Sequence, residues 1–436
     1  MTVINTQRLV LRPWEDADAE ALFALASDPA VGNAAGWPAH ASVEESRDVI
    51  RDVLRGKESF AVCLRGTGEA GEVAGTLVGA VALTDAAAST HAAGPDEREL
   101  GYWTGRPFWG RGYMPEAARA LIGHARRAWG VRTVWLGFYV GNRASARVAT
   151  RLGFRYVRCD RGIDVPLLGE VRDEAVMRLD LAAAPAEEEL ARRVRELLAG
   201  DPEPARFLSI TEPVKLGRVT VLAVGDDLGA LVRFKRNGAY FAAPVDGCAA
   251  RIMASMVPDG ALVSLCDERY LEIFAPGAAY EGLDPGRYEL WAYGADASPL
   301  ATGAIAPPEG FTIAPLGPGD IDTVEAHYAL LSHGEIEDHL ERGWIYGGFD
   351  ASGALVGFIG EHDEASMGML EIFPEARRRG YAQALEAALI DTFMAAGRIP
   401  YCHVALDNEA SKALQRKLGL RRIDTVQCWF GMPPRR

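Results

Sequence analysis

Two short segments of the chain combine glycine and arginine in a way that suits an anion. The first runs from Trp103 to Glu116 (WTGRPFWGRGYMPE) and the second from Arg377 to Ala382 (RRRGYA). Each follows a stretch that predicts a strand and precedes an apolar-faced stretch that predicts a helix. Glycines in such a loop allow several N–H groups and the positive helix end to face one phosphate. A single glycine loop is a weak signal, because an ordinary strand-to-helix turn has the same composition.

Other markers repeat in the same order around the two loops. Aligning Gly380 with Gly110 gives an offset of 270 residues, and three further pairs have offsets of 266, 266 and 278. Four ordered markers favour an internal duplication over coincidence. The three further pairs are Asn142-Arg143-Ala144-Ser145 with Asn408-Glu409-Ala410-Ser411, Leu152-Gly153-Phe154 with Leu418-Gly419-Leu420, and Leu77-Val78-Gly79 with Leu355-Val356-Gly357.

This order of motifs resembles the GNAT superfamily of acyl-CoA-dependent N-acetyltransferases. The first copy resembles the branch that acetylates ribosomal-protein N-termini, on Thr6 to Pro13 (TQRLVLRP) and on Glu99 to Trp103 (ELGYW) followed by Trp109 to Tyr113 (WGRGY). The resemblance implies an α+β (mixed α/β) fold with tandem GNAT domains. Each domain is expected to hold a mixed, mostly antiparallel sheet that is flanked by helices and splayed between strands four and five.

We expect three regions along the chain. Residues 1–182 form the ribosomal-protein-type domain and residues 307–436 the C-terminal GNAT domain. Residues 183–306 are a linker or a degenerate GNAT-like domain, similar to the N-terminal half of glycine N-acyltransferase relatives, which would pack against and complete the C-terminal copy. From 218 to 293 short strands and helices are expected to alternate, including Tyr288 to Tyr293.

The resemblance implies acetyl-CoA as co-substrate, with pantetheine bound as an extra strand in the splay. The pattern asks for Arg or Gln where Arg377 stands. In the offset of 270 its counterpart is Pro107, which has no N–H and would remove one phosphate contact. The expected cofactor-binding residues are Trp109, Gly110, Arg111, Gly112, Tyr113 and Asn142 in the first copy and Ile372, Arg377, Arg378, Arg379, Gly380, Tyr381, Ala382 and Asn408 in the second.

Acetyl transfer to an amine needs a group that removes the ammonium proton. Glu99, at the start of the fourth strand, is the candidate base of the first copy, and a solvated strand-edge glutamate is the alternative. In the second copy Glu371 competes with His362 and Glu364. Glu371 lies within a strand, where an unpaired charge is costly, so it is either catalytic or ion-paired with Arg377 to Arg379.

The leaving thiolate needs an acid, and many relatives use a tyrosine seven positions after the motif asparagine. Here those positions are Ala149 and Gln415, and neither is a phenol. The ribosomal-type branch implies Ser145 in that role and, by analogy, Ser411. The competing explanation is that these serines cap their helices.

Composition limits the other classes of function. The net charge is −14, which disfavours nucleic acid and mildly favours a cationic amine acceptor. Six scattered cysteines and the spacing of eight histidines indicate neither zinc nor disulfides, so we expect no metal and reduced thiols. No segment suggests a signal peptide or a membrane span, and the expected location is the cytoplasm. A homodimer is left open.

Three segments outside the motifs have their own predicted local structure. Pro29 to Pro38 predicts a loop whose Trp37 either lines the acceptor pocket or covers the core. Asp85 to Asp96 predicts a small, polar, mobile insertion. Val171 to Leu181 predicts the last strand of the first copy.

The sequence therefore predicts an acetyl-CoA-dependent N-acetyltransferase that acetylates a primary amine, on a small molecule or at a peptide N-terminus, by direct attack. The alternative is that one copy is a non-catalytic module for acyl-CoA binding, regulation or dimerisation.

Overall fold

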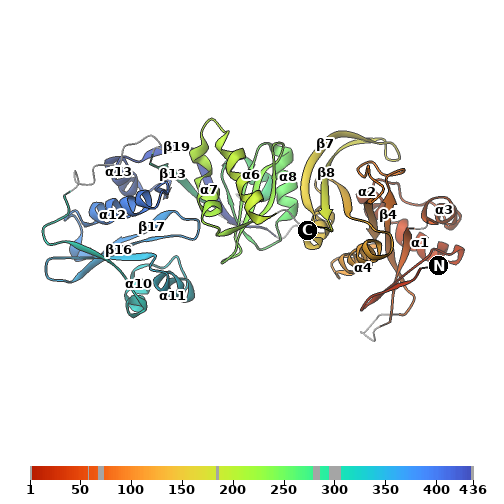
Figure 1. The fold of residues 1–436 in the computed structure, drawn as a ribbon, viewed down its shortest axis with the longest axis horizontal. Coiled ribbons are helices and arrows are strands. Elements are labelled where there is room, and N and C mark those ends of the chain that lie inside the picture. The colour runs from red at the N-terminus through yellow and green to blue at the C-terminus, as the bar shows by residue number, and fades with distance from the viewer. Residues whose placement is uncertain are drawn as a thin grey trace. The chain divides into compact units, whose positions relative to one another are not determined.

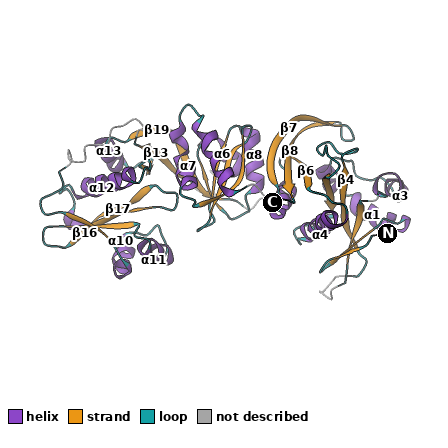
Figure 2. Ribbon diagram, in the orientation of Figure 1, coloured by secondary structure: helices purple, strands orange, loops and turns teal. Residues whose placement is uncertain are grey.

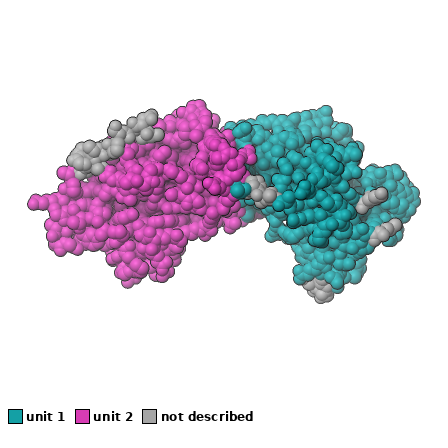
Figure 3. Space-filling view, in the orientation of Figure 1, with its two compact units in different colours: residues 1–186, 222–228, 244–258 teal, residues 187–221, 229–243, 259–436 magenta. Residues whose placement is uncertain are grey.

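The structure is a computed structural model that describes residues 2–56, 58–66, 73–182, 186–277, 285–293 and 306–433. Residues 183–185 and 294–305, at the predicted region boundaries, lie outside the described residues. The chain divides into two compact units (Figure 3). Unit 1 is Met1–Ala186, Leu222–Leu228 and Pro244–Pro258, and unit 2 is Glu187–Val221, Gly229–Ala243 and Asp259–Arg436.

Unit 1 is built on an eight-stranded sheet of order β1-β2-β3-β4-β5-β6-β8-β7. Figure 1 labels β4, β7 and β8 of this sheet. All neighbours are antiparallel except β5 and β6, which run parallel. The strands are β1 Ile4–Asn5, β2 Leu9–Arg12, β3 Ser59–Leu64, β4 Leu77–Asp85, β5 Glu97–Thr104, β6 Thr133–Tyr139, β7 Arg155–Val165 and β8 Glu170–Asp180.

Helices cover both faces of this sheet. On one face α1 packs over a core that includes Leu22, Ile50 and Trp14, with Trp103 of β5 against it. On the other face lies α4, whose apolar side is buried and whose charged side faces solvent. The helices are α1 Ala19–Ala26, α2 Pro29–Ala35, α3 Val43–Val49, α4 Tyr113–Ala128 and α5 Arg143–Leu152.

Unit 2 contributes to an eleven-stranded sheet of order β14-β15-β16-β17-β18-β13-β19-β12-β11-β10-β9. Strands β17 and β18 run parallel, as do β11 and β12. The strands are β9 Val219–Gly225, β10 Gly229–Phe234, β11 Tyr240–Pro244, β12 Leu262–Leu265, β13 Gly286–Ala292, β14 Thr312–Pro315, β15 Ile345–Phe349, β16 Leu355–Glu361, β17 Met367–Ile372, β18 Tyr401–Ala405 and β19 Arg421–Gly431.

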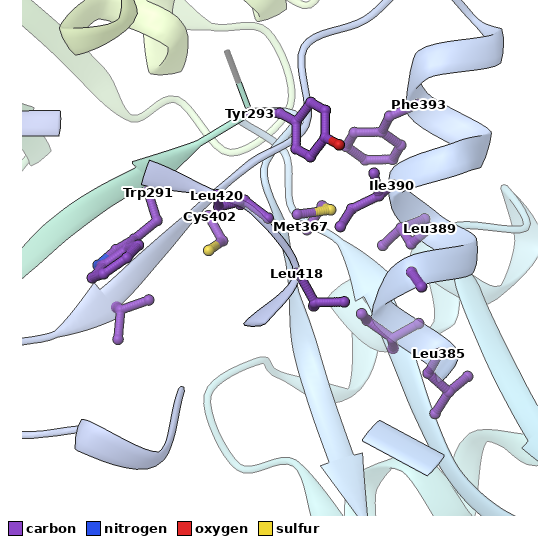
Figure 4. Packing of buried hydrophobic residues seen from close by; sticks show 13 residues of the cluster. Trp291, Tyr293, Met367, Leu385, Leu389, Ile390, Phe393, Cys402, Leu418 and Leu420 are labelled. Carbon is purple, nitrogen blue, oxygen red and sulfur yellow. The ribbon is translucent and has the colours of Figure 1, made fainter. Parts of the chain in front are cut away.

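One core of unit 2 lies between this sheet and α12. Leu385, Ile390 and Phe393 of α12 pack on Met367 and Cys402 of the adjoining strands (Figure 4). A second core includes Val324 of α10 and Ile336 and Leu340 of α11. In Figure 2 these two helices lie across β16 and β17 from α12. The remaining helices are α6 Glu187–Ala199, α7 Leu208–Lys215, α8 Gly247–Met256, α9 Leu271–Phe274, α10 Ile321–His327, α11 His333–Glu341, α12 Tyr381–Ala395 and α13 Glu409–Lys417.

Each sheet opens into a V between two parallel strands, β5 and β6 in unit 1 and β17 and β18 in unit 2. β5 and β6 pair only at Glu97↔Thr133, Arg98↔Val134 and Glu99↔Trp135, although β5 continues to Thr104. β17 and β18 pair only at Met367↔Cys402. The mixed, mostly antiparallel sheet with a splay between these strands is therefore confirmed as the fold class.

Strand β13 comes from the predicted middle region and lies inside the C-terminal sheet. It pairs with β18 on one side and with β19 on the other. The middle region thus contributes a strand to the C-terminal sheet.

Two predictions of local structure were wrong. The loop expected at Pro29 to Pro38 contains α2, because Asp28 accepts a hydrogen bond from the Ala30 N–H and Pro29 fits the first helical position. The sequence also failed to reveal β7, Arg155–Val165, which forms a long hairpin with β8. Five of its eleven residues are charged, and the strand lacks the regular apolar alternation on which recognition depends.

Candidate functional site

The two glycine loops have the same local structure. Each has a short 3-10 turn, Arg106–Phe108 or Pro374–Ala376, before the glycine that starts the next helix. Gly112 and Gly380 are the N-cap residues of α4 and α12, in the left-handed region with φ of 73° and 89°. A side chain would be strained at either position.

This correspondence corrects the alignment of the loops. Trp109 Nε1 donates a hydrogen bond to the Thr104 carbonyl at 2.7 Å, and Arg377 Nε donates to the Ile372 carbonyl at 2.9 Å. The two bonds and the two N-caps share an offset of 268, not the 270 predicted from Gly110, because the first loop offers two glycines to one. Trp109, not Pro107, therefore stands where Arg377 does, and it makes the corresponding hydrogen bond.

A pocket of about 510 Å³ lies at the loop of unit 1. Arg8 on its wall is paired with Glu116, at 2.8 Å. Within the described residues no carboxylate pairs with Arg111, Arg119 or Arg151, so three cationic side chains face the start of α4. The full lining is Gln7, Arg8, Gly110, Arg111, Gly112, Pro115, Glu116, Arg119 and Arg151.

Other predicted loop residues pack within the protein. Tyr113 is 3% exposed, with the Arg8 guanidinium over its ring, and Tyr381 stacks at a tilt near Phe311. Ala382 lies in the first turn of α12. The arginines Arg377, Arg378 and Arg379 are exposed, and Arg378 has a φ of 59°.

The motif asparagines cap the helices that follow the splay. Asn142 Oδ1 accepts a hydrogen bond from the Ser145 N–H, and Asn408 Oδ1 accepts one from the Ser411 N–H. The serines therefore do not cap α5 and α13, and that competing explanation for them is wrong. The Tyr102 hydroxyl donates to the Ser145 carbonyl at 3.4 Å, which places a phenol beside the start of α5.

Glu99 lies where β5 and β6 stop pairing. Its Oε2 accepts hydrogen bonds from Ser89 Oγ at 2.5 Å and from the Thr90 N–H at 3.1 Å. The segment expected to be a mobile insertion is thus tied to the base candidate. Gly101 follows on the same face of the strand, and a side chain there would meet nothing within 4 Å. Glu99 therefore borders open space within the V.

Aromatic side chains border the same face. Trp37 makes an edge contact with Trp103, with 6.1 Å between ring centroids, and packs on the α1 core. Both expectations for Trp37, wall and core cover, are compatible with this position.

In unit 2 the carboxylates are arranged differently. Glu371 Oε1 lies 2.9 Å from Arg377 Nη2, which is the ion pair left open by the sequence. Glu364 is buried, accepts a hydrogen bond from Ser366 Oγ at 2.8 Å and lies 3.6 Å from His403 Nδ1. Burial opposes its ionisation, but His403 and His362 outweigh burial and lower the pKa of Glu364 to about 2.

Sequence reasoning missed several side chains that surround the loop pocket and the opening of the sheet in unit 1. Arg119 and Arg151 come from α4 and α5, His91 from the supposed insertion, and Glu174 from β8. They are distant in sequence and belong to no local motif. The folded sheet brings them together.

Comparison with known families supports part of these assignments. Residues 8–155 match the model described as acetyltransferase (GNAT) domain. This part of unit 1 is thus similar to GNAT acetyltransferase domains. Residues 345–430 match the family described as FR47-like protein.

Individual proteins are similar to parts of the chain. An uncharacterised protein of Bacillus subtilis (strain 168), YkkB, is 28% identical over 174 residues, which are 38% of this chain and 92% of that protein. A GNAT-family acetyltransferase from Bacillus anthracis has a TM-score of 0.36 and 22% identity, covering 42% of this chain and 100% of that one. A ribosomal L7/L12 alpha-N-protein acetyltransferase solved with coenzyme A has a TM-score of 0.34 and 22% identity, covering 42% and 100%.

Within the described residues, no group of three or more His, Cys, Asp or Glu is arranged to hold a metal ion. None of the helices described is both long and apolar enough to cross a membrane.

Proposed function

We propose that the protein is an acetyl-CoA-dependent N-acetyltransferase that acetylates a primary amine by direct attack, and that unit 1 holds a complete catalytic site. The observation that carries this proposal is the arrangement along β5. Glu99 stands at the closed end of the V, and the glycine loop follows Thr104 at the open end. Five residues of extended strand span about 17 Å between them, which suits an elongated thioester arm.

The loop pocket fits the charged end of such a ligand. Arg111, Arg119 and Arg151 lack carboxylate partners within the described residues, and guanidinium groups bind phosphate through paired N–H donors. The start of α4 adds a positive dipole end. Unpaired backbone groups of β5 and β6 inside the V can bind an extended arm as a strand would.

Bound acetyl-CoA supplies the acetyl group as a thioester. Glu99 takes the proton from the acceptor ammonium, and the neutral amine attacks the acyl carbon directly. Backbone N–H groups of the open strand stabilise the developing oxyanion. Ser145 donates the proton to the leaving thiolate.

For unit 2 we propose a second acetyl-CoA site at Arg377 to Gly380, with Asn408 and Ser411 at the start of α13. The ion pair with Arg377 accounts for Glu371. Of the three residues named from the sequence, Glu364, which lies 3.6 Å from His403 Nδ1, is therefore the better base candidate. A specific observation favours the alternative of a non-catalytic second copy. With the offset of 268, the position of Glu99 is occupied by Met367.

Calorimetric titration of acetyl-CoA into the whole chain, combined with chromatographic detection of free CoA in the presence of polyamines, aminoglycosides or peptides, tests this proposal. Wild-type chain should bind and turn over with at least one amine. Gly112→Val should abolish binding at unit 1, because a β-branched residue is strained at a φ of 73° and displaces the loop. Gly130→Val is the matched control, since Gly130 has a φ of 69° and lies outside the pocket lining. Absence of binding by the wild type would overturn the proposal.

A further inference from the structure

His91 is the one buried imidazole that faces the base candidate of unit 1 among the described residues. Its side chain is 3% exposed, and Nε2 lies 3.4 Å from Glu174 Oε2 and 3.9 Å from Glu99 Oε1. Nε2 forms no close hydrogen bond within the described residues. A buried nitrogen is thus aimed between two carboxylates at the closed end of the V.

The other ring nitrogen fixes the tautomer. Arg158 Nη2 lies 3.4 Å from His91 Nδ1, and Asp160 holds the same guanidinium through bonds of 2.7 and 2.9 Å. A guanidinium can only donate, so Nδ1 has to accept. The imidazole proton is therefore on Nε2, directed at Glu99 and Glu174.

Space for this arrangement is created by Gly137 on β6. A Cβ at this position would clash with the Glu174 carboxylate and lie 2.8 Å from His91 Nε2. Without a donor between them, the two carboxylates would repel each other, and that repulsion favours protonation of one of them. A protonated Glu99 cannot accept a proton from an amine.

We propose that His91 is a positioning residue that keeps Glu99 ionised as the base by donating Nε2–H into the Glu99–Glu174 pair. This inference rests on the proposed function of unit 1. It assigns a role to the segment before β5, which the glycine motifs do not cover.

The charged and titratable groups around His91 come from several elements. Glu99 lies on β5, Arg158 and Asp160 on β7, and Glu174 on β8. Tyr139 of β6 faces Glu174, with the Arg172 guanidinium 5.0 Å above its ring. The interaction with Glu174 and the charge of Glu99 raise the pKa of His91, against burial and Arg158.

The first test compares kcat/KM against pH for three variants. His91→Asn should lower kcat/KM by about 10- to 100-fold near neutral pH and move the acidic limb to higher pH, because one carboxylate then keeps a proton. His91→Gln, whose amide N–H can reach the Nε2 position, should retain more activity. His91→Asn combined with Glu174→Gln should bring the acidic limb back toward wild type, since the repelling charge is gone.

A purely structural role predicts another result. A loss that is equal at every pH, or a double variant no better than His91→Asn, would overturn the proposal. His124→Gln is the control, because His124 packs against Trp129 on α4, at 5.2 Å between ring centroids, outside the V.

The second test does not depend on turnover. Nitrogen NMR of histidine-labelled whole chain should show one resonance, lost in His91→Gln, with an unprotonated Nδ1 and a protonated Nε2. Its titration midpoint should fall in Glu174→Gln. The opposite tautomer, or a midpoint insensitive to Glu174, would overturn the assignment even if acetyl transfer is confirmed, whereas an inactive wild type with the expected resonance would count against the proposed function alone.

Discussion

An imidazole lies at the corresponding strand position in both units, but a different part of the chain supplies it in each. The turns after β6 and β18 superpose in sequence with an offset of 266, so Gly137 of unit 1 corresponds to His403 of unit 2. In unit 1 that position is a glycine, and His91 reaches over it from outside the sheet. In unit 2 the imidazole belongs to the strand itself and lies 3.6 Å from Glu364.

The difference shows that neither copy can be understood by transferring residue numbers from the other. Glu99 is replaced by Met367, while the carboxylate near the imidazole of unit 2 precedes the strand rather than beginning it. The two copies share the geometry that the backbone forms, as at the helix caps, and differ in the geometry that side chains form.

A second contrast lies between the helices that follow the two loops. In unit 1, Ala118 of α4 and Ala149 of α5 are both fully buried. Their counterparts in unit 2 are Glu386 and Gln415, joined by a 2.7 Å hydrogen bond from Gln415 Nε2. Glu386 Oε2 and Gln415 Oε1 have no partner among the described residues. A proton on Glu386 can join these two atoms, and burial raises the pKa of Glu386 to about 7.

The largest difference between the two copies is expected in the effect on kcat of replacing Glu99 or Glu371. Glu99→Gln should lower kcat by about 100-fold or more, because it removes the base. Glu371→Gln should change it by no more than about fivefold, since a pair with an arginine side chain 56% exposed is worth at most about 1 kcal/mol. Steady-state rates with a common amine measure both. A larger loss for Glu371→Gln would reverse the assignment.

The Glu386–Gln415 pair gives a pH test that unit 1 cannot show. The pKa of Glu386 is about 7 in the folded state and 4.5 in the reference, so its stabilisation is fully present below pH 4.5 and is lost as pH rises to 7. The loss amounts to roughly 3 kcal/mol. Hydrogen exchange of α12 amides at pH 5 and pH 8 should show this fall in wild type and not in Glu386→Gln. Equal slopes would contradict it.

The glycine at the imidazole position can be tested directly. Gly137→Ala should reduce kcat/KM by about 10- to 100-fold, because the methyl group displaces Glu174 and His91. Gly123→Ala, in the middle of α4, has Arg127 Nη1 at 3.4 Å as its nearest neighbour and should leave the rate unchanged. If both variants keep full activity, the packing above Gly137 has no part in catalysis.

The smallest effect is expected at the exposed loop. Trp109→Phe removes the donor to the Thr104 carbonyl and should raise the KM for acetyl-CoA by about 2- to 10-fold. Trp109→Arg should retain it, because Arg377 makes the same bond in unit 2. Initial rates at varied acetyl-CoA concentration distinguish the two. Equal loss in both variants would mean that the indole ring, rather than its N–H, matters.

The backbone of the site was predictable from sequence because short motifs specify it. Glycines at left-handed positions and asparagines that cap helices leave local signatures, and Gly112, Gly380, Asn142 and Asn408 were all identified. Gly110 misled the alignment by two residues, because two glycines fit the motif and only the backbone shows which one caps the helix.

The side-chain environment was not predictable in the same way. His91, Arg119 and Glu174 meet through pairings between strands and helices that have no local pattern. Sequence could name Glu99 as a candidate base but could not show that His91 and Glu174 lie beside it. Long-range contacts of this kind become visible only when the sheet is formed.

The insertion of β13 between β18 and β19 has a consequence for the chain as a genetic unit. A fragment beginning at residue 307 would hold every motif of the C-terminal copy and still leave β18 unpaired on one edge and β19 on both, since it lacks β12 and β13. Such edges recruit strands from other chains and promote aggregation. The C-terminal copy therefore needs the segment before it to complete its sheet, and recombination between the two would separate the glycine-loop motif from part of that sheet.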